Sequence, residues 1–367
     1  QLSLLSRLAH ERATSERLGE LLAACEEDAG LTADARTAAN LREIRRDYDR
    51  TRKLPADLVA EISATSSRAL EAWKTAREKS DFSALQPWLE KQIALNRRKA
   101  ECYGPPAGGE LYDALLQDFE PCMTSAELEK IFEPLQAELT ELIGRISTSA
   151  YTPDQAPHRV SIPLARQRKF NEFVLQRIGF DAAAGRLDTS THPFTSGIAA
   201  GDTRLTTRYR DNEFCDALGS TMHEAGHALY EQGLPRAEFI GQPLSESVSL
   251  GIHESQSRLW ENQVGRSRAF WEWALPEARK IMAPALDRFS VDDLYHAVNT
   301  VQPRLIRVES DEATYNLHIT LRFDLERAMI RGDLEVADLP QAWNARIKQD
   351  LGLDVPDDAR GCLQDIH

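Results

Sequence analysis

Residues 214–229 read FCDALGSTMHEAGHAL and give the clearest indication of the architecture. The apolar members of this segment recur every three or four positions, as along one face of an α-helix. They are Phe214, Leu218, Met222, Ala225 and Leu229. The pattern predicts a helix over 212–232 that packs its apolar face into a core and leaves its polar edge at a cleft.

The first hundred residues continue the helical pattern toward the N-terminus. Residues 1–103 are rich in Ala, Leu and charged side chains and poor in Gly and Pro, which is typical of successive helices. Four apolar residues share one helical face, namely Phe82, Leu85, Leu89 and Ile93. The segment YGPPAGG at 103–109 interrupts the pattern, and we expect it to join two helical layers.

The rest of the chain is also helical in pattern, apart from one segment. Between 188 and 210, two glycines and the run LTTRY at 205–209 predict a loop and a short strand. The sequence therefore predicts a mainly α fold with a small β element. We expect helices over 125–148, 160–178, 244–264, 267–280, 291–302, 311–331 and 339–351.

Composition limits the partners of the protein. The formal net charge of −14 repels phosphate backbones and anionic lipid, so nucleic acid and membrane are poor partners, whereas peptides remain acceptable. The five cysteines are scattered without a C-x-x-C pair, which favours a reducing compartment. No apolar run reaches the roughly 20 residues of a membrane span. We therefore expect a cytoplasmic protein.

The segment His223-Glu224-Ala225-Gly226-His227 is an H-E-x-x-H sequence. On a helix its two histidines lie one turn apart, about 40° from each other around the axis, so both imidazoles can bind one metal ion. Glu224 is then placed to accept a proton from a water on the metal. The alternative is a chance match on a solvated helix face, but the apolar stripe beside the histidines favours the metal site.

A catalytic zinc site needs a third protein ligand and an open position. The next expected helix contains Glu254, 27 residues after His227, which leaves room for a turn and an antiparallel return. We favour Glu254 as the ligand because two histidines with one carboxylate form an established catalytic zinc set. His253 is the rival ligand, and Glu246 and Glu261 lie one or two turns away on the same helix.

The sequence resembles the carboxypeptidase Taq family of metallocarboxypeptidases in several motifs besides the H-E-x-x-H segment. The resemblance is strong over residues 190–367. The motifs, in order, are His192-Pro193-Phe194, Asp202-Thr203-Arg204-Leu205-Thr206, His223 to His227, Gly241-Gln242-Pro243, His253-Glu254-Ser255-Gln256, Ile306-Arg307-Val308-Glu309-Ser310-Asp311, and Gly361-Cys362-Leu363-Gln364-Asp365-Ile366-His367.

The resemblance implies a large helical fold with a deep substrate groove, one divalent metal per subunit and removal of C-terminal amino acids from peptides. Zinc is the favoured metal, with cobalt as the alternative. It also implies a homodimer, with Glu254 as third ligand and Arg307 gripping the free carboxylate of the substrate. Structural pairing of Arg307 with Glu309 or Asp311 is the alternative.

Further site residues are expected within these motifs and, for Tyr315 and His318, on the helix at 311–331. Gln364 and His367 are expected to bind substrate. Tyr315 and His318 are expected to face the groove, although a buried core role for this pair is an equal alternative. Support of the ligands or of nearby loops is expected from five residues, namely His192, Asp202, Arg204, His253 and Asp311.

We therefore expect a single helical peptidase domain over 1–367. An N-terminal helical layer would occupy 1–110, and the metal site and groove would lie in 190–367. Family members continue past the Gln-Asp-x-His motif, so the C-terminal part of the family domain is expected to be missing. The alternative functions are a helical oligopeptidase, a dipeptidyl carboxypeptidase, and an inactive metal-stabilised scaffold.

Overall fold

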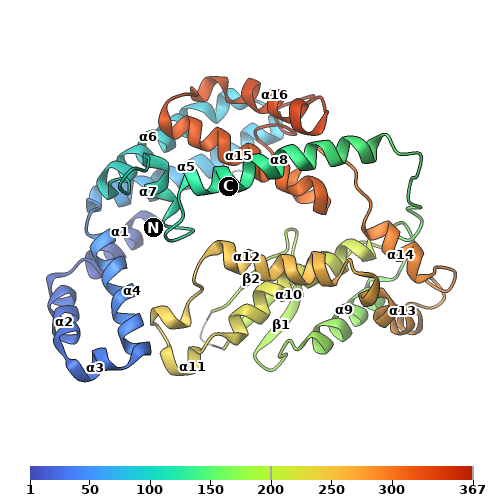
Figure 1. Ribbon diagram of the computed structural model, residues 1–367, viewed down its shortest axis with the longest axis horizontal. Helices are drawn as coiled ribbons and strands as arrows, with labels where there is room; N and C mark the ends of the chain where they lie inside the picture. Colours follow the sequence, from blue (N-terminus) through green and yellow to red (C-terminus); the bar gives the residue numbers. More distant parts are fainter. Residues whose placement is uncertain (199–200, 366–367) are drawn as a thin grey trace. The chain divides into compact units, whose positions relative to one another are not determined.

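The computed structural model describes residues 1–198 and 201–365 and divides into two compact units (Figure 1). Unit 1 comprises Gln1–Thr148 together with the chain from Val301 onward, and unit 2 comprises Ser149–Thr300. The chain therefore leaves unit 1 and returns to it. Whether the two units fold as the single domain expected from the sequence stays a prediction.

The described residues of unit 1 form helices and the loops that join them. Its N-terminal portion contains α1 (Leu2–Ala13), α2 (Glu16–Glu27), α3 (Ala29–Ala33), α4 (Ala35–Thr51), α5 (Ala56–Lys79), η1 (Phe82–Ala84), α6 (Gln86–Tyr103), α7 (Leu111–Leu116) and α8 (Ser125–Ser147). The returning portion adds η4 (Arg307–Glu309), α15 (Glu312–Arg331), η5 (Val336–Asp338) and α16 (Leu339–Leu351).

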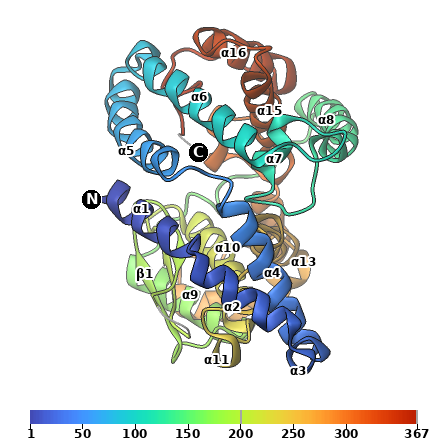
Figure 2. The same cartoon turned by 90° about the vertical axis from the view of Figure 1, so that its left-hand side faces the viewer.

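Helix α15 is the centre of unit 1. It packs against α6, α7, α8 and α16, so helices from both ends of the sequence share one core (Figure 2). Buried members of this core include Phe82, Leu317, Leu321, Trp343 and Leu363. The helix begins at Asp311, whose carboxylate accepts hydrogen bonds from the backbone N–H groups of residues 313 and 314.

Unit 2 combines helices with a small sheet. Its elements are α9 (Leu164–Ile178), β1 (Gly185–Thr189), β2 (Thr195–Ser196), β3 (Thr203–Thr207), α10 (Phe214–Gly233), α11 (Arg236–Phe239), η2 (Pro243–Ser245), α12 (Leu250–Arg258), the π-helix η3 (Leu259–Val264), α13 (Arg268–Met282) and α14 (Val291–Val298).

The sheet has the order β1-β3-β2, with β1 parallel and β2 antiparallel to the central strand β3. Leu205 of β3 pairs with Leu187 of β1 and with Thr195 of β2. Both leucines are buried in a cluster with Ala225 and Ala228 of α10. This packing holds β2 against the helix that carries the H-E-x-x-H sequence.

The other side of α10 faces the main core of unit 2. Phe214, Leu218 and Met222 are buried there with Phe170 of α9 and Trp271 of α13. Three of the five apolar residues of the opening segment lie in this core, and Ala225 and Leu229 pack in the cluster on the sheet side, so the predicted core-packed helix is confirmed. The two histidines lie on the side of α10 that faces α12.

The fold class predicted from the sequence is confirmed, with one difference in the elements near the site. Residues 244–264 were expected to form one helix, but they form the turn η2, the helix α12 and the π-helix η3. Helix α12 begins only after Ser249, whose hydroxyl accepts a hydrogen bond from the N–H of Ile252. No helix in the described part of the chain is long and apolar enough to cross a membrane.

Candidate metal centre

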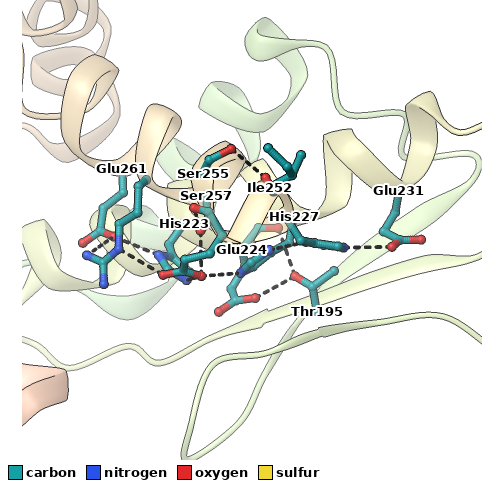
Figure 3. Close-up of polar contacts among 12 residues, drawn as sticks. Thr195, His223, Glu224, His227, Glu231, Ile252, Ser255, Ser257 and Glu261 are labelled. Carbon is teal, nitrogen blue, oxygen red and sulfur yellow. Dashed lines mark hydrogen bonds and ion pairs between the residues drawn. The ribbon is translucent and has the colours of Figure 1, made fainter. Parts of the chain in front are cut away.

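Helices α10 and α12 bring three donor side chains together in unit 2. His223 and His227 lie one turn apart on α10, and Glu254 lies on α12. Oε2 of Glu254 is 3.7 Å from Nε2 of His223 and 3.3 Å from Nε2 of His227. Figure 3 shows the two imidazoles side by side with Glu224 close to them.

This spacing fits a metal ion. Two donors that each lie about 2.0–2.1 Å from an ion in tetrahedral geometry are roughly 3.4 Å from each other. The ligand atoms of all three side chains lie within 4.8 Å of one another, and no other trio of His, Cys, Asp or Glu is so placed in the chain as described. The donor set of two imidazoles and one carboxylate is that of several catalytic zinc sites.

The charge state of Glu254 also suits a cation. Burial raises the pKa of this carboxyl, but the adjacent His227 and the charges of His223 and Arg258 outweigh it and bring the pKa to about 2. The carboxylate is held by Ser257 Oγ on Oε2 at 3.0 Å and by Arg258 Nε on Oε1 at 3.0 Å. Glu254 is therefore an ionised and oriented candidate ligand.

Gly226 allows the two helices to come this close. A Cβ atom at this position would lie 2.5 Å from Cα of Ser257 and closer still to the carbonyl oxygen of Gln256. Real Cβ atoms do not approach backbone so closely, so a larger residue would push α12 away from α10. The glycine within H-E-x-x-H therefore sets the distance between the histidines and Glu254.

Glu224 lies beside the metal ligands and is buried, with 6% of its surface exposed. The hydroxyl of Thr195 on β2 lies 2.7 Å from Oε2 of Glu224 and 2.9 Å from the backbone oxygen of the same residue. Thr195 thus donates to one of the two carboxylate oxygens of Glu224, Oε2. The small sheet has a direct role here, because it fixes the orientation of the expected base.

His223 is supported by a carboxylate from the π-helix η3. Its Nδ1 lies 2.8 Å from Oε2 of Glu261, which also contacts Arg258 and Arg266. Burial raises the pKa of Glu261, but the hydrogen bond from His223 and the charge of Arg258 lower it overall. Burial lowers the pKa of His223, and Glu261 reverses this and raises it. Glu261 thereby fixes the ring of His223.

His227 has a different partner. Its Nδ1 lies 2.6 Å from Nδ1 of His253, and Nε2 of His253 lies 2.8 Å from Oε1 of Glu231. Glu231 in turn forms an ion pair with Arg236. Both ring nitrogens of His253 therefore have protein partners, which favours Glu254 over His253 as the third ligand. Burial lowers the pKa of His253 and favours the neutral ring.

The predicted substrate arginine lies in unit 1. The guanidinium of Arg307 contacts Asp365 at 3.1 Å and donates to the hydroxyl of Tyr315 at 2.8 Å. Asp365 also binds Arg322 of α15 at 2.8 Å. Arg307 is thus paired with a carboxylate, as in the structural alternative, but the partner is Asp365 rather than Glu309 or Asp311. Binding of substrate by Arg307 stays a prediction.

Three other predicted residues in unit 1 have structural roles. Gln364 is buried; its Oε1 accepts from the backbone N–H of Arg307, and its Nε2 donates to the backbone oxygen of Leu305. His318 is fully buried with Nε2 on the backbone oxygen of Arg304, so it takes the core role rather than facing a groove. Asp311 is the cap of α15.

The remaining predicted residues lie between β1 and β3, in β3 itself, or outside the described chain. His192 is exposed, and its Nδ1 lies 2.9 Å from the backbone oxygen of Pro193. Asp202 binds Arg204 and accepts from the N–H of Ile198, so this pair braces the loop that precedes β3. His367 lies outside the described residues.

Sequence reasoning did not assign roles to several residues of these sites. They are Thr195, Glu231, Arg258, Glu261, Arg322 and Asp365. Thr195 directly follows the His-Pro-Phe motif and Asp365 lies within the motif at 361–367, so both positions offered a signal. Arg258 offered another, because it lies four residues after Glu254 on the same helix. Glu231, Glu261 and Arg322 act through contacts between elements, for which local sequence carries no signal.

The comparisons with known proteins agree with this geometry. A model of the carboxypeptidase Taq (M32) metallopeptidase family matches residues 1–367. The chain belongs to this family. It is 44% identical to thermostable carboxypeptidase 1 of Thermus thermophilus over all of its own length and 73% of that protein. It is 38% identical to carboxypeptidase 1 of Bacillus subtilis, covering 96% of this chain and 70% of that protein.

Solved structures give the same result for the carboxypeptidase Taq fold. The M32 carboxypeptidase of Deinococcus radiodurans matches with a TM-score of 0.93 and 40% identity over 100% of this chain and 72% of that chain. Family membership confirms the predicted activity class: the chain is a metal-dependent carboxypeptidase, a hydrolase of peptide bonds. The family is also one that uses a divalent metal ion, as the site predicts.

Proposed function

We propose that this carboxypeptidase binds one divalent ion through His223, His227 and Glu254 and hydrolyses the C-terminal peptide bond with Glu224 as general base. The observation that carries the proposal is the convergence of three donor atoms within 4.8 Å, with the Glu224 side chain next to them. Zinc is the proposed metal, with cobalt as the alternative, because imidazole and carboxylate donors suit both.

When bound, an ion at this site would lower the pKa of a coordinated water toward neutrality and polarise the scissile carbonyl. As a water attacks the scissile carbonyl carbon, Glu224 accepts a proton from that water. Glu224 then gives the proton to the amine nitrogen that leaves when the C–N bond breaks. Its burial and the hydrogen bond from Thr195 support this role, because they hold one carboxylate oxygen and limit competing contacts with water. His223, His227 and Glu254 would hold the ion in place.

We also propose that Arg307 binds the terminal carboxylate of the substrate. Arg307 and Arg322 share a single carboxylate, Asp365, so this trio carries one excess positive charge at neutral pH. Its members are largely buried, which strengthens their attraction for an anion. Burial and the charge of Arg322 lower the pKa of His318 to about 4, so this histidine adds no charge.

Glu326 lies one turn from Arg322 on α15 and hydrogen-bonds Tyr112. Burial raises the pKa of its carboxyl, and the hydrogen bond from Tyr112 and the charge of Arg322 oppose this rise. A guanidinium can bind a planar carboxylate through parallel hydrogen bonds. The substrates would accordingly be peptides with a free C-terminus.

The enzyme is further proposed to be a cytoplasmic homodimer. The family resemblance supports the dimer, and the five cysteines, all free, support a reducing compartment. Light scattering on the purified protein would measure the mass of the assembly directly.

The general-base role is tested with Glu224→Gln, which keeps the side-chain shape but removes the basic carboxylate. We expect the variant to retain the metal content of the wild type and to lose activity on an unblocked pentapeptide by about 10²- to 10⁴-fold. Asp216→Asn, an exposed change on the first turn of the same helix, is the matched control. A fully active Glu224→Gln protein would remove this residue from the mechanism.

The same assay separates the alternative functions. A carboxypeptidase releases single amino acids one at a time from the C-terminus of the pentapeptide. Release of dipeptides would favour a dipeptidyl carboxypeptidase, internal cleavage would favour an oligopeptidase, and no cleavage by the metal-loaded protein would favour an inactive scaffold.

A further inference from the structure

The two metal-binding histidines are supported in different ways. His223 contacts a carboxylate directly, through Glu261, whereas His227 contacts a second imidazole, His253, which in turn contacts Glu231. Figure 3 shows the two carboxylates, Glu261 and Glu231, at opposite ends of this line of polar contacts. The contacts from His227 to a carboxylate therefore pass through one additional imidazole. The positions of the hydrogens on these two rings depend on each other.

A carboxylate can only accept hydrogen bonds, so Glu231 fixes the direction of the whole line. Arg236 forms an ion pair with Glu231, which stabilises the ionised form of that carboxylate. Nε2 of His253, 2.8 Å from Glu231, must then carry a hydrogen and donate it. In a neutral ring, Nδ1 of His253 is left with a lone pair.

The next contact follows from the first. Nδ1 of His253 and Nδ1 of His227 are 2.6 Å apart, a distance at which one must donate and the other accept. Since Nδ1 of His253 accepts, Nδ1 of His227 carries the hydrogen. Nε2 of His227 is consequently the nitrogen with the free lone pair, and it is this atom that lies 3.3 Å from Oε2 of Glu254.

We infer that Glu231 and His253 are positioning residues that set the tautomer of His227, so that its Nε2 lone pair is presented to the metal before the ion arrives. This inference rests on the proposed ligand set. It assigns roles to two polar side chains that the mechanism above does not use, and it makes Glu231, which lies beyond His253 from the metal ligands, a determinant of metal affinity.

The packing around His253 supports a fixed ring. The ring centroid of His253 lies 4.7 Å from that of His227 and 4.9 Å from that of Tyr230. The residue is also anchored at the start of α12, where its backbone N–H donates to the backbone oxygen of Ser249. A ring that contacts two other rings and has a partner at both nitrogens can transmit a hydrogen-bond direction from Glu231 to His227.

The experiment measures affinity for Zn²⁺ by competition with a chromophoric chelator, and the visible spectrum of the Co²⁺-loaded protein. His253→Phe keeps the ring packing but removes both nitrogens, and we expect it to weaken Zn²⁺ binding about 10- to 100-fold and to alter the Co²⁺ spectrum. His253→Asn should recover part of the loss, because its side-chain oxygen can accept from Nδ1 of His227. Glu231→Met should weaken binding about 10-fold.

Ser255→Ala is the matched control, because Ser255 is exposed on the same helix and its hydroxyl bonds only within that helix among the described contacts. It should bind Zn²⁺ like the wild type. Circular dichroism of the metal-free variants checks folding; if His253→Phe does not fold, Glu231→Met and His253→Asn carry the test. Affinities within twofold of the wild type in the folded His253 and Glu231 variants would overturn the inference.

His223→Ala distinguishes failure of the inference from failure of the proposed function. If His223→Ala still binds one Zn²⁺ as tightly as the wild type, the proposed ligand set itself is wrong. If His223→Ala loses the metal but the His253 and Glu231 variants do not weaken binding, only the inferred role of Glu231 and His253 is wrong.

Discussion

Each candidate ligand of the metal centre is supported by one further side chain. Each ligand contacts a further side chain that constrains it: Glu261 for His223, His253 for His227 and Arg258 for Glu254. Such partners orient a ligand and tune its basicity, and their loss commonly weakens metal binding. Hydrogen bonds from the protein itself therefore orient the three candidate ligands.

Thr195 gives a prediction that the sequence alone did not provide. Thr195→Val removes the hydroxyl that holds Oε2 of Glu224, and we expect kcat to fall about 10-fold, equivalent to losing roughly 1.4 kcal/mol of hydrogen-bond stabilisation. KM and metal content should change little. Thr195→Ser keeps the hydroxyl and should stay near the wild type, and equal kcat values for Val and Ser would contradict the assignment.

Arg307 is tested with a pair of peptides that differ only at the C-terminus. The wild type should cleave the free acid far better than the C-terminal amide. In Arg307→Ala we expect kcat/KM for the free acid to fall about 100-fold, as for loss of roughly 3 kcal/mol in charged hydrogen bonds, and the preference to disappear. Arg304→Ala, a nearby exposed arginine, is the control. An unchanged preference in Arg307→Ala would reject the role.

Residue identity predicted the three candidate ligands that the structure brings together, but not their partners. The offset of four between His223 and His227 is a local property of a helix, so the sequence was sufficient for it. Glu231 and Glu261 contact the site only because α10, α12 and η3 pack in one register, which no local pattern encodes. For His318, the sequence left a groove-facing role and a buried role as equal alternatives, and the residue is buried.

At the scale of elements, the distance between α10 and α12 is the critical quantity. Gly226→Ala would place a Cβ against the backbone of Ser257, and we expect a loss of about 1–3 kcal/mol in the free energy of unfolding, together with weaker metal binding. Thermal unfolding and metal titration measure the two effects.

Gly219 provides the control on the same helix. A Cβ at Gly219 meets no atom within 4 Å, so Gly219→Ala should be neutral or stabilise by up to about 1 kcal/mol. If Gly226→Ala proved as stable and as tight a metal binder as Gly219→Ala, the close approach of α10 and α12 would not matter to the site.

The elements themselves were predictable to different degrees. The helix at 339–351 was expected with the bounds that α16 has, because its apolar periodicity is regular and its ends are marked by Pro and Gly. The strand was expected at 205–209 but lies at Thr203–Thr207, because β-propensity does not fix where a strand begins and ends. The π-helix at Leu259–Val264 was not expected, because its apolar spacing resembles that of an α-helix.

At the scale of the whole molecule, the sequence indicated the fold class but not its division into units. Composition and periodicity are sums over local properties, and they indicated a mainly α protein. Unit 1 is discontinuous, with boundaries after residues 148 and 300, and its core joins Phe82 to Leu317 and Trp343. Contacts over such sequence separations are invisible to local patterns, and the deep groove expected from the family stays a prediction.

The central claim is that His223, His227 and Glu254 bind one ion. Anomalous diffraction from crystals of the protein, recorded on both sides of the zinc and cobalt absorption edges, tests it most directly. The account predicts a single peak about 2.0–2.2 Å from Nε2 of both histidines and from the carboxylate of Glu254. A peak bound by His253 in place of Glu254, or an ion that contacts none of the three side chains, would contradict it.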